Sequence, residues 1–129
     1  MALIVLDASV VIGLLEQQDA HHDAATEALR HHAADMLSLP ASAYAEVLTG
    51  PARVGRLESA RDDIAALGAR VSRIDERVAE DAARLRARFR SLRLPDALVI
   101  AEGESSSADK ILTTDRTWAP VSRRVHVIG

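Results

Sequence analysis

The sequence lacks cysteine and is nearly free of aromatic residues, and each shortage excludes a class of protein. Without cysteine there is no disulfide scaffold, thiolate nucleophile, thiolate zinc site or iron–sulfur cluster. Tyr44, Phe89 and Trp118 are too few for an RNA-binding surface built from stacked rings. The apolar runs Ala2–Leu6 and Val10–Leu15 are too short to span a bilayer, and no basic segment precedes them. We therefore expect a cytoplasmic protein with no membrane contact.

The chain has ordinary globular proportions but an uneven distribution of charge. It has 129 residues, of which 48% are apolar and 27% charged, so we expect one domain over residues 1–129 with its own core. Residues 1–50 carry one arginine and seven acidic residues, whereas residues 51–100 carry eleven arginines and eight acidic residues. Arginine suits bidentate phosphate contacts, although a GC-rich genome would also produce an arginine-rich chain.

Strand-like and helix-like patterns alternate along the chain. Short apolar or alternating runs predict strands at Ala2–Leu6, Met36–Leu39, Arg70–Ile74, Lys110–Thr113 and Val125–Ile128. Helical patterns cover Ala8–Glu16, His22–Ala34, Ser42–Leu48, Leu57–Leu67, Asp75–Leu92 and Asp96–Glu104. We expect Pro40 to stop the second strand and Gly50-Pro51 to break the third helix. The alternation predicts a three-layer α/β/α domain around a mostly parallel sheet of four to five strands.

Four acidic residues lie where such a sheet places its ligands. Asp7 follows the first strand and Asp115 follows the strand Lys110–Thr113. Glu46 lies in the first turns of the helix after the second strand. Because ligands bind at the carboxyl ends of parallel strands, these three side chains should share one edge. Asp96 reaches that edge only if the helix Asp75–Leu92 returns the chain there.

The chemistry of this cluster favours a hard cation, and each acid also has a structural alternative. Several carboxylates at close range raise one another's pKa unless a cation compensates them. Oxygen ligands without histidine or cysteine select Mg²⁺ or Mn²⁺, which can activate water for phosphodiester hydrolysis. Alternatively, Asp7, Asp96 and Asp115 are helix N-caps and Glu46 is a solvated helix residue.

At these same residues the sequence resembles the PIN-domain ribonucleases. The segment Val5-Leu6-Asp7-Ala8-Ser9-Val10-Val11 is similar to the first motif of that family, and Tyr44-Ala45-Glu46-Val47-Leu48 to the second. Pro95-Asp96-Ala97-Leu98-Val99-Ile100-Ala101 and Leu112-Thr113-Thr114-Asp115-Arg116 are similar to the third and fourth. Each motif is short, but their order and spacing match over essentially the whole chain. A chain of this size is most similar to VapC toxins of type II toxin–antitoxin pairs.

The resemblance implies a function for the acidic residues and for their neighbours. It implies that Asp7, Glu46, Asp96 and Asp115 bind Mg²⁺ or Mn²⁺ and are catalytic, with Ser9 and Thr113 supporting the site by hydrogen bonds. It further implies an endoribonuclease toxin that cleaves single-stranded or looped RNA, forms a homodimer and is inhibited by a VapB-type antitoxin.

Three other functions remain open. A PIN-type nuclease of host RNA maturation or decay would lack a short partner gene directly upstream. A receiver-type phospho-acceptor module needs an acidic pair after the first strand and a lysine after a late strand, whereas Asp7 stands alone and Lys110 precedes its strand. A degenerate PIN fold acting only as a scaffold would not need all four acids.

Several residues around the motifs have less certain roles. Arg84, Arg86, Arg88, Arg90 and Arg93 lie within ten residues that contain no acid, and they either bind RNA or complement a helix dipole. On one continuous helix, Arg84 and Arg88 would lie on one flank and Arg86, Arg90 and Arg93 on the other. We take Arg90, Arg93 and Arg116 as RNA-contact candidates. Trp118 either anchors a short last helix or stacks on a base. His21, His22, His31 and His32 are expected to be solvated, with a pH-sensitive or metal-binding role as the alternative.

Overall fold

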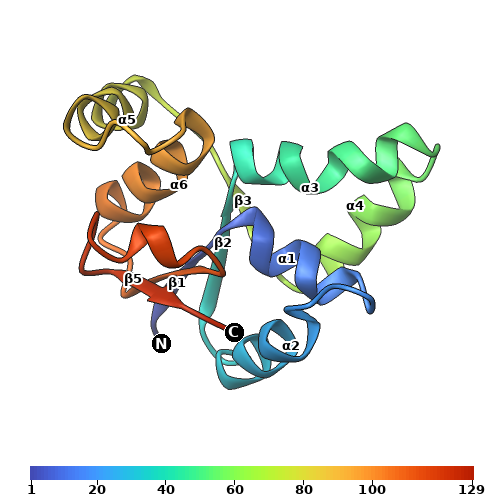
Figure 1. The fold of residues 1–129 in the computed structure, drawn as a ribbon. Helices are drawn as coiled ribbons and strands as arrows, with labels where there is room; N and C mark the ends of the chain where they lie inside the picture. The colour runs from blue at the N-terminus through green and yellow to red at the C-terminus, as the bar shows by residue number, and fades with distance from the viewer.

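The computed structural model describes residues 1–129 and contains a single five-stranded sheet (Figure 1). Its strands are β1 (Leu3–Leu6), β2 (Met36–Pro40), β3 (Arg70–Ser72), β4 (Lys110–Thr113) and β5 (Val125–Val127). The spatial order is β3-β2-β1-β4-β5, and every neighbouring pair is parallel. The chain first winds from β1 towards β3 and then crosses back to β4. The topological switch point therefore lies between β1 and β4, where open α/β sheets bind ligands.

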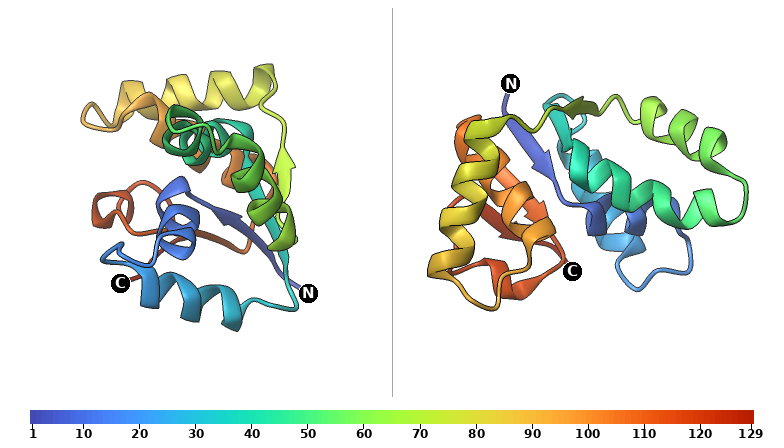
Figure 2. Two further views of the ribbon diagram at one scale, coloured as in Figure 1. Left: turned by 90° about the vertical axis from the view of Figure 1, so that its right-hand side faces the viewer. Right: turned by 90° about the horizontal axis from the view of Figure 1, so that it is seen from above.

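Helices cover both faces of this sheet, which confirms the predicted three-layer architecture. They are α1 (Ala8–Leu15), α2 (His22–His31), α3 (Ala41–Arg53), α4 (Leu57–Ala66), α5 (Glu76–Arg88), α6 (Leu94–Ser105) and a 3₁₀ turn, η1 (Arg116–Trp118). In Figure 1, α5 and α6 lie at the upper left, above β5, whereas α1, α3 and α4 lie to the right of β1 and β2. Seen from above in Figure 2, β1 runs between the α5–α6 pair and the α3–α4 pair. No helix is long and apolar enough to cross a membrane.

Two helix boundaries differ from the sequence-based expectation. α3 continues through Gly50 and Pro51 to Arg53, because a proline near a helix end removes only one hydrogen bond and its φ suits the helix. α5 ends at Arg88 rather than Leu92, and Phe89–Arg93 form a turn. Pro95 lies in the first turn of α6, where its missing N–H costs no helix hydrogen bond.

One strand end also differs. β2 includes Pro40, which pairs in register with Ser72 of the edge strand β3, so proline does not stop the strand one residue earlier. At this place in the sheet β2 tolerates the missing N–H, because Pro40 is its last residue.

Two aspartates accept backbone hydrogen bonds at the amino-terminal end of β1. The backbone N–H of Ala2 donates to Asp35 Oδ1 at 2.9 Å, and that of Leu3 donates to Asp109 Oδ2 at 2.8 Å. His32 Nδ1 lies 2.8 Å from Asp35 Oδ2, and its side chain is only 7% exposed. The prediction of four solvated histidines is therefore wrong for His32, which α2 turns inward against the strand end.

Candidate active site at the carboxyl edge of the sheet

Asp7 is the most deeply buried carboxylate at the switch point. It directly follows β1 and is only 7% exposed, beneath the start of α1. Its Oδ2 accepts hydrogen bonds from Ser9 Oγ at 2.7 Å and from Thr113 Oγ1 at 2.8 Å. Both hydroxyls donate to the same oxygen, so Oδ1 takes no hydrogen bond from either of these side chains.

The two hydroxyls that hold Asp7 also fix the loop after β4. Ser9 Oγ accepts from the backbone N–H of Thr114, and Thr113 Oγ1 accepts from that of Asp115, each at 3.1 Å. Each hydroxyl thus donates to Asp7 and accepts from the neighbouring loop. The network connects residues more than a hundred positions apart and sets Asp115 next to the end of β1.

Glu46 and Asp96 approach the same edge from α3 and α6. Glu46 lies in the second turn of α3 and is exposed, whereas the side chain of Asp96 is 14% exposed. Asp96 lies in the first turn of α6. The preceding helix α5 runs back to the carboxyl edge, which is the condition that the prediction for Asp96 required. Arg93 Nε lies 3.5 Å from Asp96 Oδ2, and its side chain is 76% exposed, so it sits as a counter-ion at the rim.

The pKa values show that these carboxylates act on one another. Burial raises the pKa of Asp7, with a further increase from the Asp96 charge, although the Ser9 and Thr113 hydrogen bonds oppose it. Glu46 is exposed as a residue, but partial desolvation of its carboxyl group raises its pKa, and the charges of Asp7 and Asp96 add to this. Burial raises the pKa of Asp96, which Arg93 lowers and Asp115 raises. The fold therefore brings like charges together, and the charge of Arg93 compensates them only in part.

The capping alternatives are resolved differently for the three aspartates. Asp7 occupies the N-cap position of α1, but its side chain makes no cap hydrogen bond. Asp96 is not an N-cap at all, since Arg93 holds that position of α6. Asp115 does cap η1, and its Oδ1 accepts from Thr117 N at 2.9 Å and from Thr117 Oγ1 at 2.6 Å. Capping thus accounts for Asp115 alone.

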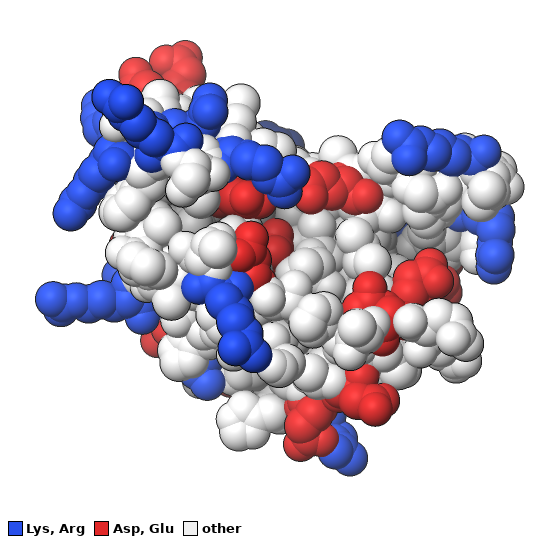
Figure 3. Space-filling view, in the orientation of Figure 1, with Lys and Arg blue, Asp and Glu red and all other residues white.

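The side chains do not form a closed metal cage in this geometry. No three histidine, aspartate or glutamate side chains are grouped closely enough to hold an ion. Figure 3 shows acidic side chains around a hollow in the centre of this face. The donor chemistry of the four carboxylates nevertheless fits a divalent cation, which prefers oxygen ligands.

The arginine-rich segment is arranged differently from the predicted helix flanks. Arg84 pairs with Asp81 at 2.7 Å, Arg86 Nε donates to the backbone of Leu92 at 3.0 Å, and Arg88 lies 5.2 Å from the Phe89 ring centroid. Arg90 and Arg93 lie beyond the end of α5, in the turn that leads to the acidic hollow. Figure 3 shows arginine side chains along this rim.

Trp118 belongs to the core and also acts on the site. It is 1% exposed, which rules out stacking on a base and confirms its anchoring role. Its buried indole N–H has no partner within hydrogen-bond geometry, yet it helps to lower the pKa of Asp96. Sequence analysis did not connect Trp118 with Asp96, because the two meet only when η1 folds back beside α6.

The structure contradicts the receiver-type alternative. Lys110 is the first residue of β4, at the opposite end of that strand from Thr113. A lysine there lies at the amino edge of the sheet, so it cannot contact Asp7 at the carboxyl edge.

Solved structures share this fold over nearly their whole length. A toxin–antitoxin complex from Klebsiella pneumoniae is 20% identical, with 96% of each chain covered and a TM-score of 0.76. VapBC2 from Rickettsia felis, bound to a DNA fragment from its promoter, is 12% identical, with 98% of this chain and 99% of that chain covered and a TM-score of 0.79. The sarcin–ricin loop cleaving toxin VapC20 from Mycobacterium tuberculosis is 18% identical, with 92% and 95% covered and a TM-score of 0.75.

Comparison of the sequence alone gives a consistent assignment. No curated protein matches the chain. The profile of the PIN domain family, however, matches residues 4–123, a span that includes all four carboxylates and the hydroxyls that hold Asp7. The match covers most of the chain, and the observed parallel α/β/α fold agrees with it, so the chain belongs to the PIN domain family.

Proposed function

We propose that this chain is a metal-dependent endoribonuclease and the toxin of a toxin–antitoxin pair. The observation that carries the proposal is the convergence of Asp7, Glu46, Asp96 and Asp115 from four separate elements at the switch point of the sheet. The raised pKa values of the first three support the proposal, because the fold holds these like charges close together. The solved neighbours, which include an RNA-cleaving toxin, support the same assignment.

The four carboxylates are the proposed ligands of Mg²⁺ or Mn²⁺. A bound divalent cation would lower the pKa of a water nucleophile and neutralise charge that develops on the phosphate. Asp7 would offer Oδ1, because Ser9 and Thr113 hold its other oxygen. Those two hydroxyls fix the orientation of Asp7, in the way that outer hydrogen bonds orient metal ligands generally.

Arginines at the rim are the proposed contacts to the RNA backbone. Arg90, Arg93 and Arg116 are exposed and lie on the turn before α6 or directly after Asp115. Arg93 would exchange its contact with Asp96 for a substrate phosphate once a metal ion compensates the carboxylates. An RNA strand would then lie across the hollow, with its phosphate over the acidic residues.

The proposed partners follow from the toxin assignment. We expect a small VapB-type antitoxin to bind this chain and inhibit it, and the chain to form a homodimer. The neighbours from Klebsiella pneumoniae and Rickettsia felis were solved as toxin–antitoxin assemblies. Induced expression in a bacterial host should arrest growth, and sequencing of RNA 5′ ends should then show new cleavage sites.

The decisive experiment measures cleavage of RNA by the purified chain under different cations. Mg²⁺ and Mn²⁺ should support cleavage and excess EDTA should abolish it. Ca²⁺ should bind but support cleavage poorly, because its coordination geometry is looser. Full cleavage in excess EDTA would exclude the proposed mechanism.

A further inference from the structure

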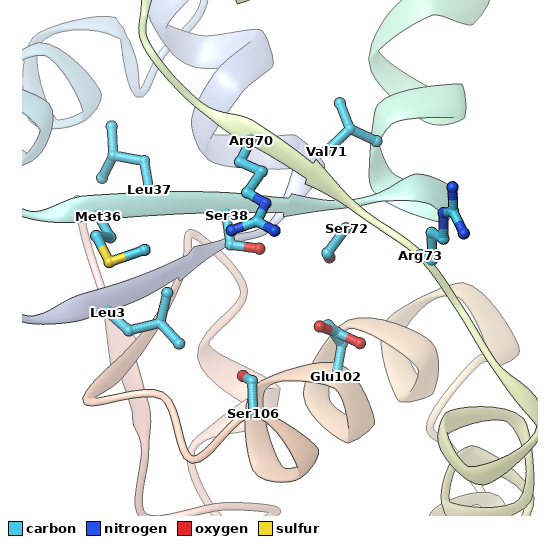
Figure 4. Close-up of a pocket in the computed structure, with 10 residues that line it drawn as sticks. All are labelled: Leu3, Met36, Leu37, Ser38, Arg70, Val71, Ser72, Arg73, Glu102 and Ser106. Atoms are coloured by element: carbon cyan, nitrogen blue, oxygen red, sulfur yellow. The ribbon is translucent and has the colours of Figure 1, made fainter.

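The buried acid of α6 shows how this fold satisfies a carboxylate that lies away from the site. Glu102 is 9% exposed, beside a cavity of about 620 Å³ between α6 and the sheet. Burial raises the pKa of Glu102, and a hydrogen bond from Ser72 opposes that increase. In Figure 4 the Ser72 side chain points from β3 towards Glu102. A hydroxyl of the neighbouring strand thus partners this acid, and the cavity needs no ligand to compensate it.

Asp115, at the carboxyl edge, is held by two donors that belong to one residue. Its Oδ1 accepts from the backbone N–H of Thr117 at 2.9 Å and from the Thr117 hydroxyl at 2.6 Å. The backbone bond alone completes the cap of η1, because an N-cap side chain needs only a free N–H of the first turn. Thr117 is exposed, so burial does not require its hydroxyl to find a partner either. The hydroxyl contact therefore fixes the carboxylate beyond what capping requires.

An equivalent arrangement holds Asp7 at the end of the adjacent strand. β1 and β4 pair in parallel, and Asp7 and Asp115 follow their carboxyl ends. Ser9 stands two residues after Asp7 and donates its hydroxyl to Oδ2, just as Thr117 stands two residues after Asp115. A second donor reaches the same oxygen in both cases, from Thr113 for Asp7 and from the Thr117 backbone for Asp115. The carboxylates on the two sides of the switch point are thus held by matching contacts.

The two carboxylates that come from helices lack this arrangement. Leu48 stands two residues after Glu46, and Leu98 stands two residues after Asp96. Asp96 has the guanidinium of Arg93 at 3.5 Å instead. A hydroxyl two residues after the acid is therefore a feature of the strand ends within this site, and the bond angle and direction of those two carboxylates are set by the protein alone.

We propose that Thr117 is a positioning residue for Asp115, with the same role that Ser9 has for Asp7. The proposal rests on the proposed function, in which Asp115 is a ligand of Mg²⁺ or Mn²⁺. Hydrogen bonds to a ligating carboxylate fix its orientation before the ion arrives, so less side-chain freedom is lost on binding. Trp118, the next residue, is 1% exposed and anchors η1 in the core, which gives the Thr117 hydroxyl a fixed place.

Calorimetric titration of RNA-free protein with Mn²⁺ tests this role. Thr117→Val removes the hydroxyl and keeps both the side-chain shape and the backbone N–H that caps η1. The affinity for Mn²⁺ should fall about tenfold or more, as is usual when an outer partner of a metal ligand is lost. Thr117→Ser keeps the hydroxyl and should retain the wild-type affinity.

A second threonine provides the matched control. Thr26 is exposed on α2, and its hydroxyl donates to the backbone of His22 at 2.8 Å, away from the carboxyl edge. Thr26→Val should leave the affinity for Mn²⁺ unchanged. Trp118 is the only tryptophan, so its fluorescence reports the fold of η1, and the emission of metal-free Thr117→Val should match that of the wild type.

The possible results separate this role from the proposed function itself. If the wild type binds Mn²⁺ and Thr117→Val binds it equally well, Thr117 is not a positioning residue, although the metal site stands. If the wild type binds no Mn²⁺, both proposals fail. Weak binding by both Thr117→Val and Thr117→Ser, with altered Trp118 emission, would also overturn the proposal, because the loss would then come from the fold of η1.

Discussion

The two ends of the central strands use aspartate in opposite ways. At the amino edge, Asp35 accepts from the backbone of Ala2 and contacts His32, and these contacts hold the pKa of Asp35 below its usual value. At the carboxyl edge, burial and mutual repulsion raise the pKa values of Asp7 and Asp96. The first arrangement stabilises the fold and the second costs stability. Carboxylates that a fold retains at a cost are candidates for chemistry.

The largest expected effect comes from removing one charge at the carboxyl edge. Asp96→Asn keeps the size of the side chain but replaces a charged oxygen with an amide. RNA cleavage should fall by a factor of about a hundred or more, equivalent to a few kcal/mol of transition-state stabilisation. The melting temperature of the metal-free protein should stay equal or rise, because a repelling charge has been removed.

A variant at the amino edge provides the control for this measurement. Asp109→Ala removes the acceptor for Leu3 N and should cost about 0.5–1.5 kcal/mol of unfolding free energy, with cleavage unchanged. Retained cleavage in Asp96→Asn would exclude that residue from the site. A collapsed melting temperature in the same variant would instead show that Asp96 stabilises the fold, contrary to the comparison of the two edges.

A second prediction concerns the hydroxyl that joins the two strand ends at the switch point. Thr113→Val keeps the shape of a fully buried side chain but removes the donor to Asp7 and the acceptor for Asp115 N. The unfolding free energy should fall by about 1–3 kcal/mol, because two groups lose their partner. Thr114→Val is the control, since only the backbone of Thr114 takes part in this network. Equal denaturation midpoints for the two variants would argue against the network.

These contrasts also show which features the sequence could predict. Short apolar or alternating runs predicted all five strands, and their parallel order predicted that Asp7, Glu46 and Asp115 share one edge. The sequence-based prediction was wrong at Leu92, where the apolar stripe continues although the helix has ended. Periodicity records burial, and Leu92 stays buried in the turn, so it cannot mark where the hydrogen bonds of α5 stop.

Contacts that depend on how helices pack against the sheet were beyond the reach of pattern analysis. The contact between His32 and Asp35 depends on how α2 meets β2, and the effect of Trp118 on Asp96 depends on how η1 folds back. The burial of Glu102 was not predicted either, because a single acid within a helix is ordinarily solvated. Only the packing of α6 against the sheet shows that this acid is buried.

A third prediction concerns the arginines that border the acidic hollow. If Arg90 and Arg93 bind phosphate, changing both to glutamine should reduce the slope of log affinity against log salt by about one to two units. Binding is measured with metal-free protein and a short RNA at several salt concentrations. Arg84→Gln with Arg88→Gln is the matched control, since Arg84 pairs with Asp81 and Arg88 contacts Phe89 on α5. An unchanged slope in the Arg90 and Arg93 variant would leave only a structural role for these two residues.

The smallest expected effect is the pH dependence of stability, which should have opposite signs at the two edges. The pKa of Asp35 is lowered on folding, so its contribution is present above its ordinary value of 3.8 and is lost as pH falls through the folded pKa. The pKa of Glu46 is raised, so its folded form takes up a proton more readily than its unfolded form. The stability linked to Glu46 is therefore greatest below its ordinary pKa of 4.5 and is lost as pH rises through the folded pKa.

Melting temperatures of metal-free protein between pH 3 and pH 8 measure both effects. Asp35→Asn should reduce stability at neutral pH, with the difference from wild type vanishing in acid. Glu46→Gln should raise stability at neutral pH, with its difference also vanishing in acid, and Mg²⁺ should remove that advantage by stabilising only the wild type. If Asp35→Asn and Glu46→Gln shift stability in the same direction at neutral pH, the carboxylates of the amino and carboxyl edges do not differ in their effect on stability.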